Sequence, residues 1–184
     1  MGGGDAMLNN YCVYHLHTEQ SLLDSCTNYK LYVDRAKELG QTAICFTEHG
    51  NIYSWVEKKM YCDEQGIKYC HGVECYLTKS LTDNDGAKVR DNYHTILIAK
   101  NYDGVMEINR LCSLASQPDH FYYKPRLTFD EFLAISDNVI KISACLASPL
   151  NKMRKGDIDV DERLLAAYDY YEIQPHINSD EQKE

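Results

Sequence analysis

The stretch Thr42-Ala43-Ile44-Cys45-Phe46-Thr47-Glu48-His49-Gly50 joins a short apolar run to an acidic residue and a histidine. An apolar run of this length, bounded by polar residues, is typical of a strand buried in a sheet. Before it, apolar and aromatic side chains recur at helical spacing from Asn28 to Gly40, and Ile52 to Gln65 reads as a second helix closed by Gly66. The stretch therefore predicts a helix–strand–helix unit with ionisable side chains at the carboxyl end of its strand.

The same alternation of strands and helices continues along the chain. We expect further strands at residues 11–14, 67–77, 94–99, 139–146 and 170–174, and helices at 103–116, 128–135 and 159–168. The helix at 128–135 opens on the capping box Thr128-Phe129-Asp130-Glu131, and residues 79–92 read as a polar loop. Repeated strand–helix–strand units predict an α/β fold with a mostly parallel sheet, either open or closed into a barrel.

The composition is that of a globular domain. The chain has 184 residues, 44% of them hydrophobic, and its apolar runs fall short of the roughly 18 residues that a membrane span needs. Its start does not read as a secretory signal, and we set residues 1–10 aside as a flexible amino terminus or a cloning remnant. The net charge of −9 argues against a domain that grips phosphates mainly through Lys and Arg, but not against one that handles them through metal ions.

The eight cysteines do not form a disulfide framework. Cys12, Cys45, Cys112 and Cys145 lie in apolar runs, and the chain has no Cys-x-x-Cys pair. Buried, reduced thiols in a cytoplasmic protein are therefore the interpretation we adopt, and a structural zinc site built from cysteines is disfavoured.

Side chains that commonly bind metal ions recur where the predicted strands end. Two imidazoles leave the first strand on one face, because residues two apart in a strand point the same way. The whole set comprises His15, His17, Asp24, His49, Glu74 and Cys145, with His94 near the beginning of its strand. A lone His-x-His pair is as compatible with chance as with a metal site. Several successive strand ends of this kind favour a site, because ligands gather at the carboxyl ends of parallel strands.

The donor types indicate which ions would bind and what they would do. Imidazole, carboxylate and thiolate together suit zinc, manganese or iron, and the set exceeds what one ion can coordinate, which predicts two or three divalent ions. Such clusters suit phosphoester hydrolysis, because the ions acidify a water molecule and neutralise phosphate oxygens. The sequence has no phosphate-binding glycine loop, dinucleotide fingerprint or serine-based triad that competes with this interpretation.

The residues also match a known family. The chain resembles the PHP (polymerase and histidinol phosphatase) domain, in the form found at the amino terminus of bacterial DNA polymerase III alpha subunits. The matching segments span nearly the whole chain after residue 10: His15–Asp24, Phe46–Asn51, Gly72–Tyr76, His94–Asn101, Lys124–Arg126 and Ser143–Leu146.

The resemblance implies a distorted seven-stranded α/β barrel with a trinuclear metal centre. It assigns ligand roles to His15, His17, Asp24, His49, Glu74, His94 and Cys145, with Glu74 as the bridging carboxylate. The role of Cys145 rests on the resemblance alone, because a cysteine in an apolar strand is usually a small core residue. Active members of the family hydrolyse phosphoesters, some acting as 3′-5′ proofreading exonucleases in polymerases, whereas other members have lost the site and are structural.

Two departures from the family pattern stand out. Glu48 occupies a position that is usually Asp and that lies beside the site rather than in it. The chain also ends at Glu184 without the family's final Asp-x-His motif, for which His176 is no substitute. We therefore expect residues 11–184 to be a PHP domain that lacks its last strand or strands, either a fragment or one piece of a split polymerase. It cannot polymerise DNA alone, and the expected partners are the rest of the polymerase chain and a DNA 3′ end.

The sequence leaves open the role of Arg126 and the choice between the main function and two alternatives. Arg126, next to Tyr122 and Tyr123, is a candidate to clamp a phosphate or stack on a base, although an ordinary ion pair fits equally well. His71 and His120 read as polar structural residues rather than ligands. The main hypothesis is the PHP domain of a bacterial or phage C-family replicative polymerase. The alternatives are a free-standing phosphatase for a small phosphomonoester and a polymerase scaffold without chemistry of its own.

Overall fold

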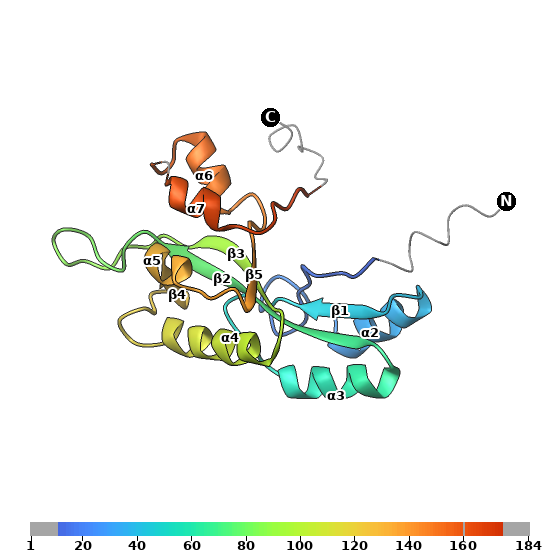
Figure 1. Ribbon diagram of the computed structural model, residues 1–184. Helices are drawn as coiled ribbons and strands as arrows, with labels where there is room; N and C mark the ends of the chain where they lie inside the picture. The colour runs from blue at the N-terminus through green and yellow to red at the C-terminus, as the bar shows by residue number, and fades with distance from the viewer. Residues whose placement is uncertain (1–10, 160, 175–184) are drawn as a thin grey trace.

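A five-stranded mixed sheet forms the centre of the protein (Figure 1). The computed structural model describes residues 11–159 and 161–174. The strands are β1 (Ala43–Phe46), β2 (Lys68–Thr78), β3 (Tyr93–Ala99), β4 (Arg126–Thr128) and β5 (Val139–Ile142), in the order β1-β2-β3-β5 with β4 paired to β2. The α/β class is confirmed. However, β3 is antiparallel to both β2 and β5, so the prediction of a mostly parallel sheet is wrong.

The long strand β2 holds the sheet together. Its first half pairs with β1 and its last residues pair with β4, both in parallel, while β3 pairs with its other edge. The strand runs unbroken through His71 and Gly72. A Cβ atom at Gly72 would lie 2.8 Å from Cys45 Sγ and 3.0 Å from Thr47 Cγ2. The glycine therefore permits close packing against β1 rather than a break in the strand.

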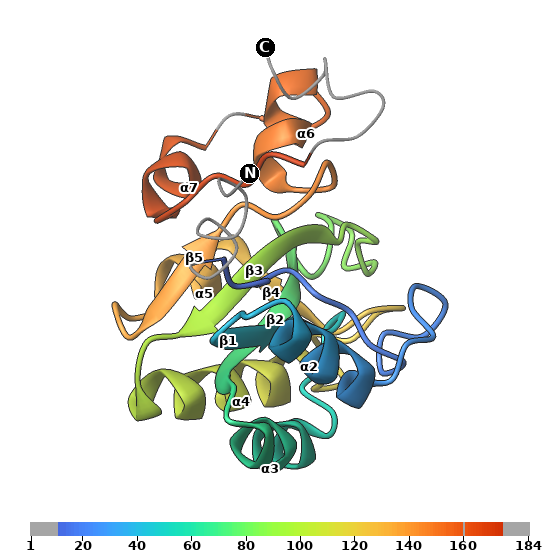
Figure 2. The same ribbon diagram turned by 90° about the vertical axis from the view of Figure 1, so that its right-hand side faces the viewer.

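Helices cover the sheet on two sides (Figures 1 and 2). Both views place α3 (Trp55–Gln65) and α4 (Tyr102–Ala115) on one side, and α6 (Pro149–Lys155) and α7 (Glu162–Ala167) on the opposite side. The remaining helices are α2 (Tyr29–Glu38), which packs on α3, and the short α5 (Phe129–Leu133). The capping box predicted for α5 is present in full, with the Thr128 and Glu131 side chains each bonded to the other's backbone amide. The helix α6 was not predicted.

The predicted outermost strands are reduced to single bridges. Residues 11–14 contribute only the pairing of Val13 with Ile44, and residues 170–174 only that of Tyr170 with Ile142. Val13 lies beside β1 and Tyr170 beside β5, which are the two end strands of the sheet. The described residues therefore extend the sheet at both edges but do not form a seven-stranded barrel. Residues 1–10 and His176 lie outside the described part of the chain. None of the described helices has the length and apolar character to cross a membrane.

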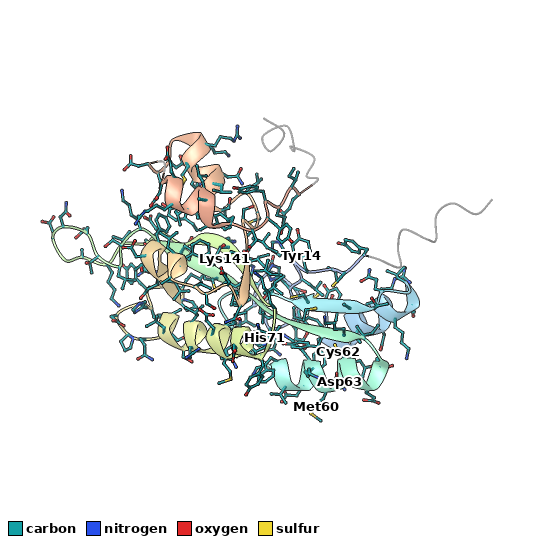
Figure 3. The ribbon with its side chains drawn as sticks, in the orientation of Figure 1. Tyr14, Met60, Cys62, Asp63, His71 and Lys141 are labelled. Atoms are coloured by element: carbon teal, nitrogen blue, oxygen red, sulfur yellow. The ribbon has the colours of Figure 1, made fainter. Side chains whose placement is uncertain are left out.

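Buried side chains hold these layers together. The largest cluster joins β2, β3 and β4 to α4, α5 and α7, and a second one packs α2 and α3 against β1. His71 belongs to this packing rather than to a site: it hydrogen-bonds to Tyr69 and to Asn109 of α4, and its ring meets Trp55 of α3 edge-on (Figure 3). All eight cysteines are free thiols, as predicted.

Candidate metal centre

All seven predicted ligands line one cleft of about 570 Å³. They come from six separate places in the chain: His15, His17, Asp24, His49, Glu74, His94 and Cys145. Tyr14, Glu172 and Gln174 also line the cleft. Among the described residues of this lining there is no lysine or arginine, so the fixed charges of the cleft are all negative. Such a lining favours cations.

Glu74 lies at the centre of the cleft, with a side chain that is only 1% exposed. Its Oε2 atom is 3.0 Å from His15 Nε2, 2.9 Å from His17 Nε2 and 3.5 Å from His49 Nδ1. Its Oε1 atom faces His94 Nδ1. One carboxylate therefore touches four imidazoles, which is the arrangement expected of a bridging ligand.

The strand arrangement explains how these side chains meet. His49 follows β1 directly and forms a parallel bridge with Glu74 of β2, whose amide donates to the Glu48 carbonyl at 3.0 Å. His15 and His17 follow the bridge at Val13, next to the carboxyl end of β1. His94 stands at the beginning of β3 and pairs with Tyr76. Because β3 is antiparallel to β2, its beginning lies at the edge where the neighbouring strands end.

Asp24 reaches the cleft from a tight loop. Its Oδ2 atom is 3.1 Å from His49 Nε2 and 3.9 Å from His17 Nε2, and its side chain is half exposed. Leu23, just before it, has a φ of 71°, in the left-handed region that a leucine rarely adopts. The strained turn directs the carboxylate inward while the Leu23 side chain stays fully exposed.

Cys145 stands at the rim of the same group. Its Sγ atom is 3.5 Å from His94 Nδ1, and it follows Ala144, whose φ is 57°. The sequence-predicted thiolate is therefore adjacent to one imidazole of the cluster.

Glu172 is a site residue that the sequence reasoning missed. Its Oε1 atom is 2.7 Å from His15 Nδ1, and its amide donates to Ser143 Oγ at 2.9 Å. A carboxylate on the far nitrogen of an imidazole orients the ring and leaves the other nitrogen for a metal. The available signal was a carboxylate within the predicted strand 170–174, although it stands in the middle of that strand rather than at its end.

Glu48 lies beside the site, as predicted, and has structural partners. It is 1% exposed, its Oε1 atom is 2.7 Å from Lys58 Nζ, and it accepts hydrogen bonds from the hydroxyls of Thr18 and Ser21, both at 2.5 Å. Ser21 Oγ in turn accepts the His49 amide at 3.1 Å and lies 3.2 Å from His17 Nδ1. Because Ser21 gives its own proton to Glu48, it is placed to accept one from His17 Nδ1, which leaves His17 Nε2 as the ligand atom.

The pKa shifts follow from these contacts. Burial alone would raise the pKa of Glu74, but hydrogen bonds with His15, His17 and His94 lower it well below its usual range. Burial lowers the pKa of His15, yet hydrogen bonds with Glu172 and Glu74 outweigh it and raise that pKa to about 10. In the same way Cys145 and Glu74 raise the pKa of His94 to about 9 against the effect of burial. Burial dominates at His49 and lowers its pKa.

The donor set fits divalent metal ions. Three overlapping groups each have their ligand atoms within 4.8 Å of one another: His15, His17 and Glu74; His17, Asp24 and His49; and His49, Glu74 and His94. Within the described chain, His49 Nδ1 and Glu172 Oε2 are buried without a hydrogen-bond partner, which leaves donor capacity for a cation. Imidazole and carboxylate ligands at this spacing suit zinc, manganese or iron.

Arg126 is not in the cleft. Its side chain is fully buried, and its guanidinium donates to the backbone carbonyls of His120, at 3.2 Å, and Val89. These contacts tie two surface loops together, so the geometry gives Arg126 a structural environment rather than access to a phosphate. His120 is also structural: it lies 2.8 Å from Glu131 and 3.0 Å from Asp119.

Comparison with known proteins identifies the family. The model of the PHP domain matches residues 14–176. The chain belongs to the PHP domain family. It is 31% identical over 164 residues to the DNA polymerase III subunit alpha of Aquifex aeolicus, and 34% identical over 169 residues to that of Helicobacter pylori. These alignments cover 82% and 86% of the chain, but the chain spans only 14% of the length of either relative.

A solved structure supports the fold. A candidate metal-dependent phosphoesterase from Bifidobacterium adolescentis matches this PHP domain with a TM-score of 0.54, over 94% of this chain and 81% of the other. At 13% sequence identity the match concerns the fold alone. It relates the mixed sheet and its helices to the fold of that protein.

Proposed function

We propose that this PHP domain is part of a bacterial or phage C-family replicative polymerase, a DNA polymerase III alpha subunit, and hydrolyses phosphoesters at a multinuclear metal centre, including 3′-5′ removal of nucleotides from DNA. The observation that carries the proposal is the single buried carboxylate of Glu74 in contact with four imidazoles. The identity to alpha subunits over most of the chain supports the polymerase context.

The metal ligands would be His15, His17, Asp24, His49, Glu74, His94 and Cys145. Two or three divalent ions of zinc, manganese or iron, when bound, supply the Lewis acidity that phosphoester hydrolysis requires. The chain's own residues prepare the site for them. Glu172 orients His15 through Nδ1, Ser21 orients His17 through Nδ1, and the half-exposed Asp24 leaves the cleft open on the side where a substrate enters.

The partners follow from the same assignment. We propose that the remainder of the polymerase chain packs on this domain, that a DNA 3′ end is the substrate, and that the protein acts in the cytoplasm, where bacterial replication takes place. Residues 11–184 would then be one PHP domain of a longer assembly.

A direct test is the release of label from 3′-labelled single-stranded DNA by the purified chain with added manganese. We expect release that depends on manganese and stops in Glu74→Gln, with an exposed-surface variant such as Lys30→Gln as the matched control. Turnover of small phosphomonoesters without release from DNA would move the assignment to a free-standing phosphatase. Tight metal binding without hydrolysis of either substrate would leave a structural scaffold and contradict the proposal.

A further inference from the structure

Lys124, two residues before Arg126, lies close to the metal centre and is separated from it by the ring of Tyr76. Lys124 Nζ lies 5.0 Å from the centre of the Tyr76 ring and donates to its hydroxyl at 3.3 Å. The same ring lies 5.0 Å from the His94 ring and 6.0 Å from the His49 ring. One aromatic ring therefore separates the Lys124 ammonium from two metal-site imidazoles.

Close packing fixes this neighbourhood. Gly50, directly after His49, has a φ of 63°, and a Cβ atom there would lie 2.6 Å from Pro125 Cγ and 3.1 Å from Tyr76. Only glycine leaves room for Pro125 on the backbone beside the ligand. The position of Lys124 relative to the cleft is therefore set by the fold rather than by a free loop.

Next to Lys124, Tyr123 is held in a costly conformation. Its φ is 60°, a left-handed value that is rare for a bulky residue, and its side chain is 63% exposed. The guanidinium of Arg90 lies 4.5 Å from the centre of its ring. Residues held in such strained conformations cluster at ligand-binding sites, and this one displays its ring to solvent.

Two other cations fix the position of the segments that carry Arg90, Tyr123 and Lys124. Lys88 Nζ donates to the carbonyls of Pro118, at 2.6 Å, and Phe121, at 3.0 Å. The buried Arg126 guanidinium donates to the carbonyls of Val89 and His120. Both cations join the loop before β3 to the segment before β4, which Figure 2 shows on the same side of the molecule. We call Arg90, Tyr123 and Lys124 the basic aromatic surface.

The charge pattern indicates the ligand. The cleft has carboxylates and no lysine or arginine in its described lining, whereas the basic aromatic surface offers two cations and an exposed ring, with Lys124 one aromatic ring away from two histidines of the cleft. A phosphomonoester has a single phosphate, and that phosphate would bind at the metal centre. A nucleic-acid strand carries further phosphates for cations and bases for a ring to stack on.

We propose that the basic aromatic surface binds single-stranded nucleic acid next to the scissile phosphate, with Arg90 and Lys124 on phosphates and Tyr123 under a base. This inference rests on the proposed function and names the residues outside the cleft that would hold the DNA strand. It also assigns phosphate binding and base stacking, which the sequence had suggested for Arg126, to the exposed residues Arg90, Tyr123 and Lys124.

The test is binding of a fluorescein-labelled ten-nucleotide thymidine strand, measured by anisotropy in EDTA so that hydrolysis cannot occur. We expect Tyr123→Ala to weaken binding at least about 5-fold, because one base can no longer stack. We expect Arg90→Gln with Lys124→Gln to reduce the slope of log affinity against log salt by about 0.7 for each phosphate that is no longer neutralised. Circular dichroism checks that each variant is folded.

The control is Lys30→Gln, which removes a lysine that lies over the ring of Tyr61 at 5.3 Å, in a setting lined by Glu57 and Glu64. It should bind the strand as the unchanged chain does. An abasic strand should bind the unchanged chain and Tyr123→Ala equally, because only a base can use the ring.

Unchanged affinity and salt slope in the surface variants would overturn the inference, as would equal weakening by Lys30→Gln. A chain that binds the strand but never hydrolyses it with metal would instead overturn the proposed function. The two failures are therefore distinguishable.

Discussion

Two glutamates on neighbouring segments, Glu48 just after β1 and Glu74 inside β2, have the same burial and opposite surroundings. Glu48 and Glu74 are each 1% exposed, and the amide of Glu74 donates to the carbonyl of Glu48. Glu48 faces Lys58 and two hydroxyl groups. Glu74 faces four imidazoles and, in the described chain, forms no ion pair with a lysine or arginine.

The difference separates a carboxylate paired with a lysine from one whose partners could also hold a metal ion. A buried carboxylate must be compensated, and Lys58 does so through a direct ion pair at 2.7 Å. Imidazoles compensate Glu74 only while they are protonated, and they can exchange those protons for a metal ion near neutral pH. The pKa of each glutamate is lowered, at Glu48 by Lys58 against the effect of burial and at Glu74 by histidines against the same effect. Only at Glu74 can the compensating protons be exchanged for a metal ion.

The first way to break this comparison is Glu48→Gln. It leaves the Lys58 ammonium buried without its partner, so we expect the free energy of unfolding in urea to fall by about 3–5 kcal/mol. Glu48→Leu combined with Lys58→Met should recover most of that loss. If the single variant is as stable as the unchanged chain, Glu48 is not the structural carboxylate of the pair.

The second prediction concerns Arg126. Arg126→Met leaves the carbonyls of Val89 and His120 without their donor, and we expect a loss of about 2–4 kcal/mol in the free energy of unfolding, measured in urea. Metal content should not change, because the side chain is outside the cleft. A stable variant that fails to bind single-stranded DNA would return Arg126 to the substrate-binding role considered from the sequence.

The third prediction concerns Glu172→Gln, which tests whether Glu172 supports metal binding through His15. The variant keeps a hydrogen-bonding group at His15 Nδ1 but removes the carboxylate charge that orients the ring. We expect the affinity for manganese to fall by about 10- to 100-fold, measured by calorimetry. An unchanged affinity would mean that Glu172 does not act through His15.

The remaining prediction is a pH dependence of the stability of the metal-free chain. His15 and His94 have pKa values raised to about 10 and about 9, so the folded state holds their protons more tightly than the unfolded state does. Their contribution to stability is complete below about pH 6.5 and is lost as the pH rises through those values. Urea unfolding in EDTA should therefore show stability falling between about pH 6.5 and the folded-state pKa values. A flat or rising profile over that range would contradict the electrostatic account.

The clustering of the predicted ligands depends in large part on local sequence order. His49 follows an apolar run directly, and the strand ends of an α/β sheet gather in one place, whereas Glu74 lies inside β2 and Cys145 was assigned by the resemblance alone. His94 was a further exception, because it begins its strand. That exception was the signal that β3 is antiparallel, but pairing direction depends on contacts distant in sequence, and the sequence pattern alone favoured a mostly parallel sheet.

Other features were set by tertiary contacts that no local pattern records. Arg126 is buried because the carbonyls of Val89 and His120 converge on it from separate loops. Glu172 matters because residues 170–174 return beside His15, 157 positions away in sequence. The strand β4 has only three residues, too few for a period to be visible.

The most direct test of the central claim is the metal content of the purified chain, measured by mass spectrometry after dialysis against zinc, manganese and iron in turn. The account predicts two or three divalent ions per chain. It also predicts loss of most of them in Glu74→Gln and in His15→Ala combined with His17→Ala. A chain without bound metal, or variants with unchanged metal content, would contradict the assignment of the cleft as a metal centre.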